Sequence, residues 1–138
     1  MQNTKQALAK AIKMMWRVAP IILGTIILVS LASVLIPKSF YAAIFQNNLL
    51  DPVVGSVIGS ILAGNPITSY IIGGELLKQG VSLIAVTAFI VAWVTVGIVQ
   101  LPAESMILGK RFAITRNLIS FILSIIVAIL TYIILTAI

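Results

Sequence analysis

The chain has no cysteine and no histidine, and only 9% of its residues are charged. Without thiols it can form no disulfide, and it lacks the usual ligands of a zinc site. Thiolate nucleophiles and imidazole acid–base catalysis are excluded in the same way, and no nucleophile with a partnered base is recognisable by spacing. We therefore expect no enzyme, no metal site and no cofactor.

Acidic residues are also scarce: three Asp and Glu stand against nine Lys and Arg, which gives a net charge of +6. A nucleic-acid-binding domain would gather such charge on one basic face. Here the cations are instead spread along the chain as the preference of Lys and Arg for the cytoplasmic side of a membrane predicts. We expect no nucleic-acid partner.

Apolar residues, in contrast, make up 61% of the chain, and the mean hydropathy is +1.21. Soluble domains are roughly 45–50% apolar and about 25% charged. Several apolar runs approach the roughly 20 residues that a helix needs to cross a bilayer. The sequence therefore predicts an all-α integral membrane protein, with the lipid bilayer as its main surroundings.

The N-terminal residues 3–17 have the pattern of an amphipathic helix on the cytoplasmic side. Its polar face carries Lys10, Lys13 and Arg17, opposite an apolar face. This segment is either a regulatory helix on the membrane surface or, as we favour, the flank that orients the first span. The apolar run at 18–36 begins a single membrane domain, 18–138, and is longer than the apolar part of a signal peptide, which favours a retained span.

Two further clean spans are predicted at about 81–99 and 118–138, which makes three transmembrane helices. A connector at 39–52 ends on Asp51 and Pro52, a combination typical of a helix start with Asp51 as the N-cap. A polar stretch with Lys110, Arg111 and Arg116 separates the last two spans.

Between these spans lies a broken element at about 53–77, whose two short apolar halves flank Gly64, Asn65 and Pro66. Proline lacks an amide hydrogen and disfavours helical geometry at the residue before it. The element is either one span broken in its middle or a re-entrant hairpin. A hairpin places seven of the nine Lys and Arg on the cytoplasmic side with the N-terminus, so the positive-inside rule favours it.

The break supplies the first candidate site, because interrupted backbone at membrane depth persists only when it is buried in protein or lines a watery cavity. Transporters use such breaks to bind substrate. The alternative is a structural kink. The candidate substrate-pathway residues here are Gly64, Asn65, Pro66, Thr68 and Ser69.

Two carboxylates are further candidates. Glu75 follows an apolar stretch and shares a helical face with Lys78, so it is either an intramembrane coupling group or part of a surface ion pair. Glu104 is expected to cap the next helix or to pair with Arg111. The pathway candidates of this second group, where another proline stands among polar residues, are Thr95, Gln100, Pro102 and Glu104.

Glycines in the broken element indicate close helix packing. Gly55 and Gly59 form a GxxxG pattern, a spacing that lets helix backbones approach in membranes. Gly73 and Gly74 are assigned the same packing role.

From about residue 51 to 116 the chain resembles the predicted-permease family that includes the organoarsenical efflux permeases. The resemblance is carried by the glycine-rich half-helix at 52–59, the break at 64–66, the segment 74–82 and the run 85–89 before a polar, proline-containing stretch. Family members look like two repeats of such a unit, and this chain looks like one, which implies a homodimer. Many members carry a cysteine motif at the break, and without thiolates binding of soft metalloids is disfavoured.

These features together predict a half-sized permease of a prokaryotic plasma (inner) membrane, multi-pass, with a cytoplasmic N-terminus. It would move a small solute or ion through an oligomeric pathway near residues 64–69. The alternatives are an oligomeric channel-like pore and a non-transporting accessory or scaffold membrane protein.

Overall fold

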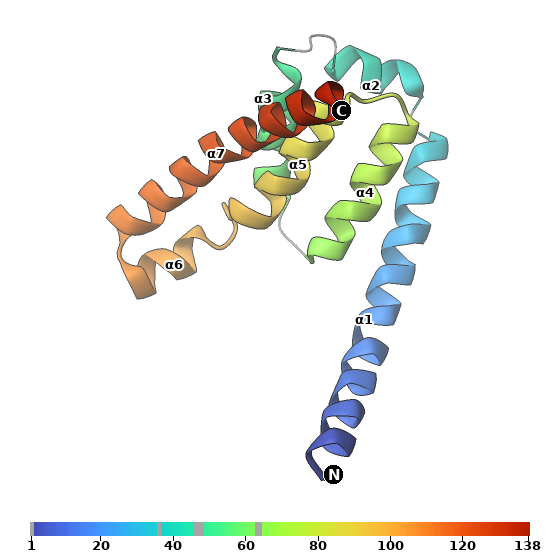
Figure 1. Cartoon of the computed structure of the whole chain (residues 1–138), viewed down its shortest axis with the longest axis vertical. Helices are drawn as coiled ribbons and strands as arrows, with labels where there is room; N and C mark the ends of the chain where they lie inside the picture. Colours follow the sequence, from blue (N-terminus) through green and yellow to red (C-terminus); the bar gives the residue numbers. More distant parts are fainter. Residues whose placement is uncertain (1, 36, 46–48, 63–64) are drawn as a thin grey trace.

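The computed structural model describes residues 2–35, 37–45, 49–62 and 65–138, and its regular elements are all α-helices (Figure 1). In chain order they are α1 (Gln2–Leu35), α2 (Lys38–Ile44), α3 (Asp51–Ile61), α4 (Pro66–Lys78), α5 (Leu83–Thr95), α6 (Leu101–Leu108) and α7 (Lys110–Ala137). The predicted all-α class is confirmed for this part of the chain.

Helix α1 joins the predicted amphipathic segment and the predicted first span into one helix of 34 residues. Pro20 lies inside it, and the helix ends just before Pro37, where the sequence predicts its end. Its N-terminal half projects away from the other helices, and α1 packs chiefly on α4 (Figure 1).

Helices α3 and α5 lie side by side and run in the same direction, while α4 runs back between them and α1 (Figure 1). The parallel pairing follows from two contacts, Gly55 against Ala85 and Gly59 against Phe89. The chain enters α3 and leaves α4 at the same end of the molecule, and α5 packs against both of these helices.

The α3–α5 contact brings backbone against backbone. A methyl group built on Gly55 would lie 2.2 Å from the carbonyl oxygen of Ala85, and one on Gly59 would lie 2.3 Å from that of Phe89. Only glycine fits at such distances, as the GxxxG spacing predicts. On its other side α3 meets α7, where the buried hydroxyls of Ser56 and Ser124 hydrogen-bond at 2.9 Å.

The other two glycines differ from each other. A methyl group on Gly73 would press against the side chains of Ile90 and Val86, so Gly73 lies in the α4–α5 contact. Nothing lies within 4 Å of the same position at Gly74. Gly74 therefore takes no part in close packing among the described residues.

In the described part of the chain, two helices are long and apolar enough to cross a membrane: Thr4–Leu28 within α1, and α7. Buried residues form 0% and 11% of their most apolar windows, whereas the core helix of a soluble protein would be mostly covered. Both helices therefore present apolar surface outward, which indicates association with a membrane.

The other predicted spans have different boundaries. Helix α5 covers only 13 residues of the predicted span at 81–99, fewer than the roughly 20 needed to cross a bilayer alone. Helix α7 begins at Lys110, well before the predicted start at 118, so the polar stretch is its first two turns.

Candidate functional site

The first interruption lies between α3 and α4, as predicted, and the polar side chains of its described residues bond to nearby backbone. Asn65 is the N-cap of α4, and its Oδ1 accepts a hydrogen bond from the amide of Ile67 at 2.9 Å. The buried Ser69 hydroxyl donates to the carbonyl of Pro66 at 2.6 Å, and the Thr68 amide donates to the carbonyl of Asn65 at 3.0 Å. Gly64 lies outside the described residues.

A second interruption separates α5 from α6, and it begins four residues before the predicted end of the span at Val99. Helix α5 ends at Thr95, and side chains from α7 hydrogen-bond to the freed backbone. The Gly97 amide donates to Oδ1 of Asn117 at 2.8 Å, and Nη2 of Arg116 donates to the carbonyl of Thr95 at 3.2 Å. The hydroxyl of Thr95 itself donates to the carbonyl of Val91 at 2.7 Å.

Glu104, in the first turn of α6, completes this arrangement. It forms an ion pair with Arg116 and accepts a hydrogen bond from Nδ2 of Asn117 at 3.2 Å. The side chains of Glu104 and Arg116 are 17% and 35% exposed, and Asn117 is buried. We call Thr95, Gly97, Glu104, Arg116 and Asn117 the α5–α7 polar network.

The alternative of a Glu104–Arg111 pair is therefore wrong: the partner is Arg116. Gly109, with a φ of +89°, turns the chain sharply between α6 and α7 and brings the second turn of α7 back onto α6. Asn117 was not predicted at all. The only sequence signal for it is a lone amide at the start of an apolar helix, where such a group needs a partner.

A groove of about 420 Å³ lies beside the network and connects it with the end of α3. Its walls are mostly apolar, with Ser60 and Asn117 as the polar exceptions. The lining residues are Val57, Ser60 and Ile61 of α3, Val96 and Ile98 of the interruption, Leu101 of α6, and Ile114, Asn117, Leu118 and Phe121 of α7. The ends of the parallel helices α3 and α5 thus open into one groove.

The remaining candidates of the second group lie at its margin. Gln100 is exposed and occupies the N-cap position of α6 without a side-chain capping bond, while its amide donates to the carbonyl of Gly97 at 3.1 Å. Pro102 is exposed in the first turn of α6. Neither residue lines the groove.

Glu75 stands apart from this network. Its Oε2 lies 3.6 Å from Nζ of Lys78, and its Oε1 accepts a hydrogen bond from Nε2 of Gln79 at 3.0 Å. The Lys78 side chain is 78% exposed. Both partners belong to the C-terminal end of α4, ten or more residues from Asn65, so the structure does not bring Glu75 to the groove.

Asp51 is the one acidic residue that is almost wholly buried, at 3% exposure. Helix α3 does begin here, but the N-cap is Leu50 and not Asp51. The Asp51 carboxylate instead accepts a hydrogen bond from the hydroxyl of Ser82, the N-cap of α5, at 3.2 Å. It therefore joins the beginnings of α3 and α5.

Two observations limit the chemistry of the described residues. They contain no group of three or more acidic, histidine or cysteine side chains that could hold a metal ion. Among their buried side-chain polar atoms, only the indole nitrogen of Trp93 has no hydrogen-bond partner. Trp93 lies on α5, where its ring packs edge-on against Phe89 with centroids 5.5 Å apart.

Comparison of the chain with family models, with curated proteins and with solved structures finds no match. The resemblance to the predicted-permease family therefore stays a prediction.

Proposed function

We propose that this chain is a half-sized permease unit, and that a small solute or ion passes through the groove at the ends of α3 and α5. The observation that carries the proposal is that α3 and α5, the helices that precede the two interruptions, both line this groove with their C-terminal ends, although Asn65, Thr68 and Ser69 do not. Interrupted backbone is expensive in lipid and is found where it is buried or lines a cavity. Transport sites commonly lie where such helix ends meet.

The polar lining of this groove is sparse and already partnered. Ser60 donates to the carbonyl of Val57, and Asn117 bonds to Gly97, Glu104 and Ala113. A solute passing here would exchange hydrogen bonds with groups that are held in place. Asn117 donates a hydrogen bond to Glu104, so a solute that displaced this bond would change the partners of the Glu104–Arg116 ion pair. This ion pair is therefore the candidate gate.

The direction of the helices supports a re-entrant position for α3 and α4. The start of α3 and the end of α4 lie at the end of the molecule that carries α2 and the C-terminus, whereas the N-terminus lies at the opposite end (Figure 1). In this topology α1, α5 with its continuation, and α7 are the spans. The membrane would be the prokaryotic plasma membrane, with the N-terminus in the cytoplasm.

A homodimer completes the proposed transport unit. Helix α5 is too short to cross a bilayer unaided, and the groove is open on one side rather than enclosed by this chain. The large apolar faces of α1 and α7 offer surface for a second copy. A partner that covers the groove would convert it into a pathway.

The test is flux through proteoliposomes that contain the purified full-length protein, screened against small cations, small anions and metalloid oxyanions. Ile61→Trp fills the groove without removing a hydrogen bond, and Ile107→Trp makes the same exchange on the outer side of α6. We expect Ile61→Trp to lower the flux about tenfold, because bulk in a narrow pathway blocks passage, and Ile107→Trp to leave it unchanged.

Flux that saturates with solute would identify a carrier, and flux that does not saturate would identify a channel-like pore through the same groove. Equal flux in the two variants, each as thermally stable as the parent, would place the pathway elsewhere. No flux for any solute would favour an accessory or scaffold protein.

A further inference from the structure

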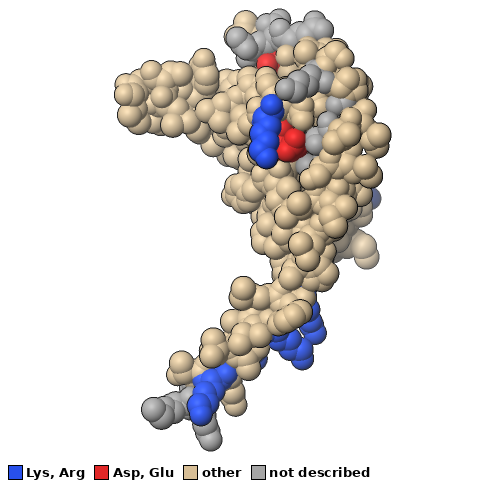
Figure 2. All heavy atoms as spheres, turned by 90° about the vertical axis from the view of Figure 1, so that its right-hand side faces the viewer, with Lys and Arg blue, Asp and Glu red and all other residues tan. Residues whose placement is uncertain are grey.

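Three cations lie together on one face of the projecting half of α1. Lys10, Lys13 and Arg17 are spaced three and four residues apart, which puts them on one side of a helix. With Met14 they line a shallow hollow of about 240 Å³. Figure 2 shows Lys and Arg gathered on this projecting segment at the lower end of the molecule.

These cations have no acidic residue to balance them nearby in the chain. The first Asp or Glu of the sequence is Asp51, which is the first residue of α3 and accepts a hydrogen bond from Ser82. Like charges at this spacing destabilise a helix unless an anion lies between them. The face is therefore built for a negatively charged group that this chain does not supply.

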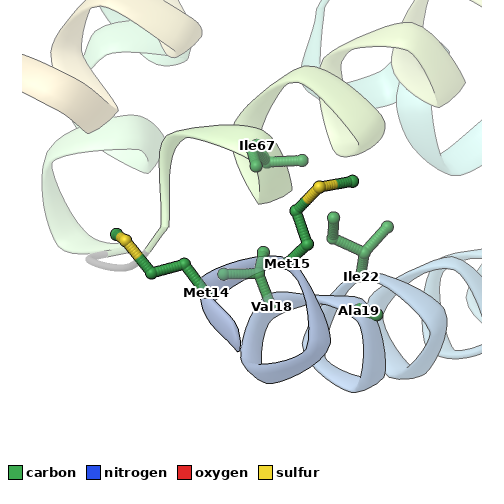
Figure 3. A pocket seen from close by; sticks show the side chains of 6 residues that line it. All are labelled: Met14, Met15, Val18, Ala19, Ile22 and Ile67. Carbon is green, nitrogen blue, oxygen red and sulfur yellow. The ribbon is translucent and has the colours of Figure 1, made fainter. Parts of the chain in front are cut away.

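An apolar hollow of about 410 Å³ adjoins the cationic one, and Met14 lines both. It lies between α1 and the first turn of α4, and Figure 3 shows Met15, Val18 and Ile22 on one side with Ile67 on the other. Its wall also includes Ala19. Two methionines make this wall flexible and adaptable to an irregular hydrocarbon chain.

The position along α1 matches the layers of a bilayer. From Arg17 to the end of α1 the helix rises about 27 Å, close to the roughly 30 Å of hydrocarbon in a membrane. Lys10 to Arg17 spans a further 10 Å or so, which covers the headgroup layer of about 5–8 Å and its edge toward water. The cations therefore lie at headgroup level when the rest of α1 lies in hydrocarbon.

We propose that α1 and α4 bind one anionic phospholipid. Its phosphate lies among Lys10, Lys13 and Arg17, which donate charge-assisted hydrogen bonds. One acyl chain fills the hollow between α1 and Ile67 and covers the apolar side chains that line it. Because Ile67 donates its amide to the Asn65 cap, the bound chain touches the α3–α4 interruption directly. This site is independent of the proposed transport function.

The test is native mass spectrometry of the purified full-length protein with phosphatidylglycerol or phosphatidylcholine. The triple variant Lys10→Gln, Lys13→Gln, Arg17→Gln removes the cationic face. The control Lys5→Gln, Lys110→Gln, Arg111→Gln removes the same charge elsewhere. We expect the first to lose about tenfold or more of the preference for phosphatidylglycerol, since each cation near an anionic lipid contributes substantially, and the control to keep it.

The acyl chain is tested separately with Ala19→Phe, which fills the apolar hollow and leaves the cations in place. We expect weaker retention of both lipids, and unchanged thermal stability in detergent. Equal losses in the two triple variants, or retention by Ala19→Phe at the parent level, would overturn the proposal. Stabilisation by inorganic phosphate as large as that by phosphatidylglycerol would also overturn it, in favour of a free-anion site.

Discussion

The two helix interruptions are held in different ways. At the first, Asn65 and Ser69 bond to backbone within one turn of α4, so the contacts join residues two or three positions apart. At the second, the partners of Thr95 and Gly97 are Arg116 and Asn117 on α7, about twenty positions along the chain. The first interruption is therefore a local feature of its own sequence, and the second exists only when α7 is docked.

This difference predicts unequal sensitivity. Changes at the first interruption should remain confined to the start of α4. Changes at the second should loosen α5, α6 and α7 together, because Arg116 and Asn117 of α7 bond both to Glu104 of α6 and to the backbone at the end of α5.

The largest effect should come from a change that separates α3 from α5 and so moves both interruptions. Gly59→Ala places a methyl group 2.3 Å from the Phe89 carbonyl oxygen, and backbone cannot yield as a side chain can. We expect a loss of about 3 kcal/mol in the free energy of unfolding, at the upper range for overpacking. Thermal unfolding in detergent, followed by circular dichroism, measures it.

The matched control is Gly74→Ala, since this helical glycine has open space around it. It should be neutral or slightly stabilising, because alanine favours helix more than glycine does. If the two variants unfolded alike, the close α3–α5 contact would be wrong.

A smaller loss is expected from Asn117→Leu, which leaves the Gly97 amide without its acceptor and removes one donor from Glu104. An unsatisfied buried amide costs about 2 kcal/mol. Hydrogen exchange should rise in the segment from Thr95 to Leu101 and along the start of α7. Thr115→Leu, an exposed change on the same helix, is the control and should have little effect.

The smallest effect is expected from Asn65→Ala, which removes the cap from α4. Loss of such a cap costs about 1 kcal/mol. Asn65→Asp keeps an oxygen for the Ile67 amide and should behave as the parent does. Exchange should rise at the first turn of α4 alone, and a loss exceeding that of Asn117→Leu would contradict the contrast between the two interruptions.

The same contrast explains what the sequence predicts. The first interruption is visible because Pro66 lacks an amide hydrogen and Asn65 is a capping residue, both short-range signals. The second lies in an apolar run where only Thr95 and Gly97 depart from the pattern, and a threonine and a single glycine are weak signals. The hydrogen bonds that Arg116 and Asn117 make to its backbone depend on the tertiary fold, which the sequence does not show.

Helix boundaries follow the same logic. The close contact of α3 can be predicted from its own sequence, because Gly55 and Gly59 have the GxxxG spacing. The structure shows this contact, with α5 as the partner. The start of α7 could not be read in this way. Lys110, Arg111 and Arg116 look like a polar loop between spans, yet they are helical because Gly109 allows the turn and Glu104 pairs with Arg116 in α7.

The parallel packing of α3 and α5 has an electrostatic consequence. Helix dipoles that lie side by side and point the same way repel, with about half a positive charge at each N-terminus and half a negative charge at each C-terminus. The carboxylate of Asp51 lies where the two N-termini meet, beside Ser82, and the guanidinium of Arg116 lies on the carbonyl that ends α5. The buried Asp51 carboxylate thus offsets the N-terminal end of the doublet, and Arg116, which also pairs with Glu104, offsets the C-terminal end of α5.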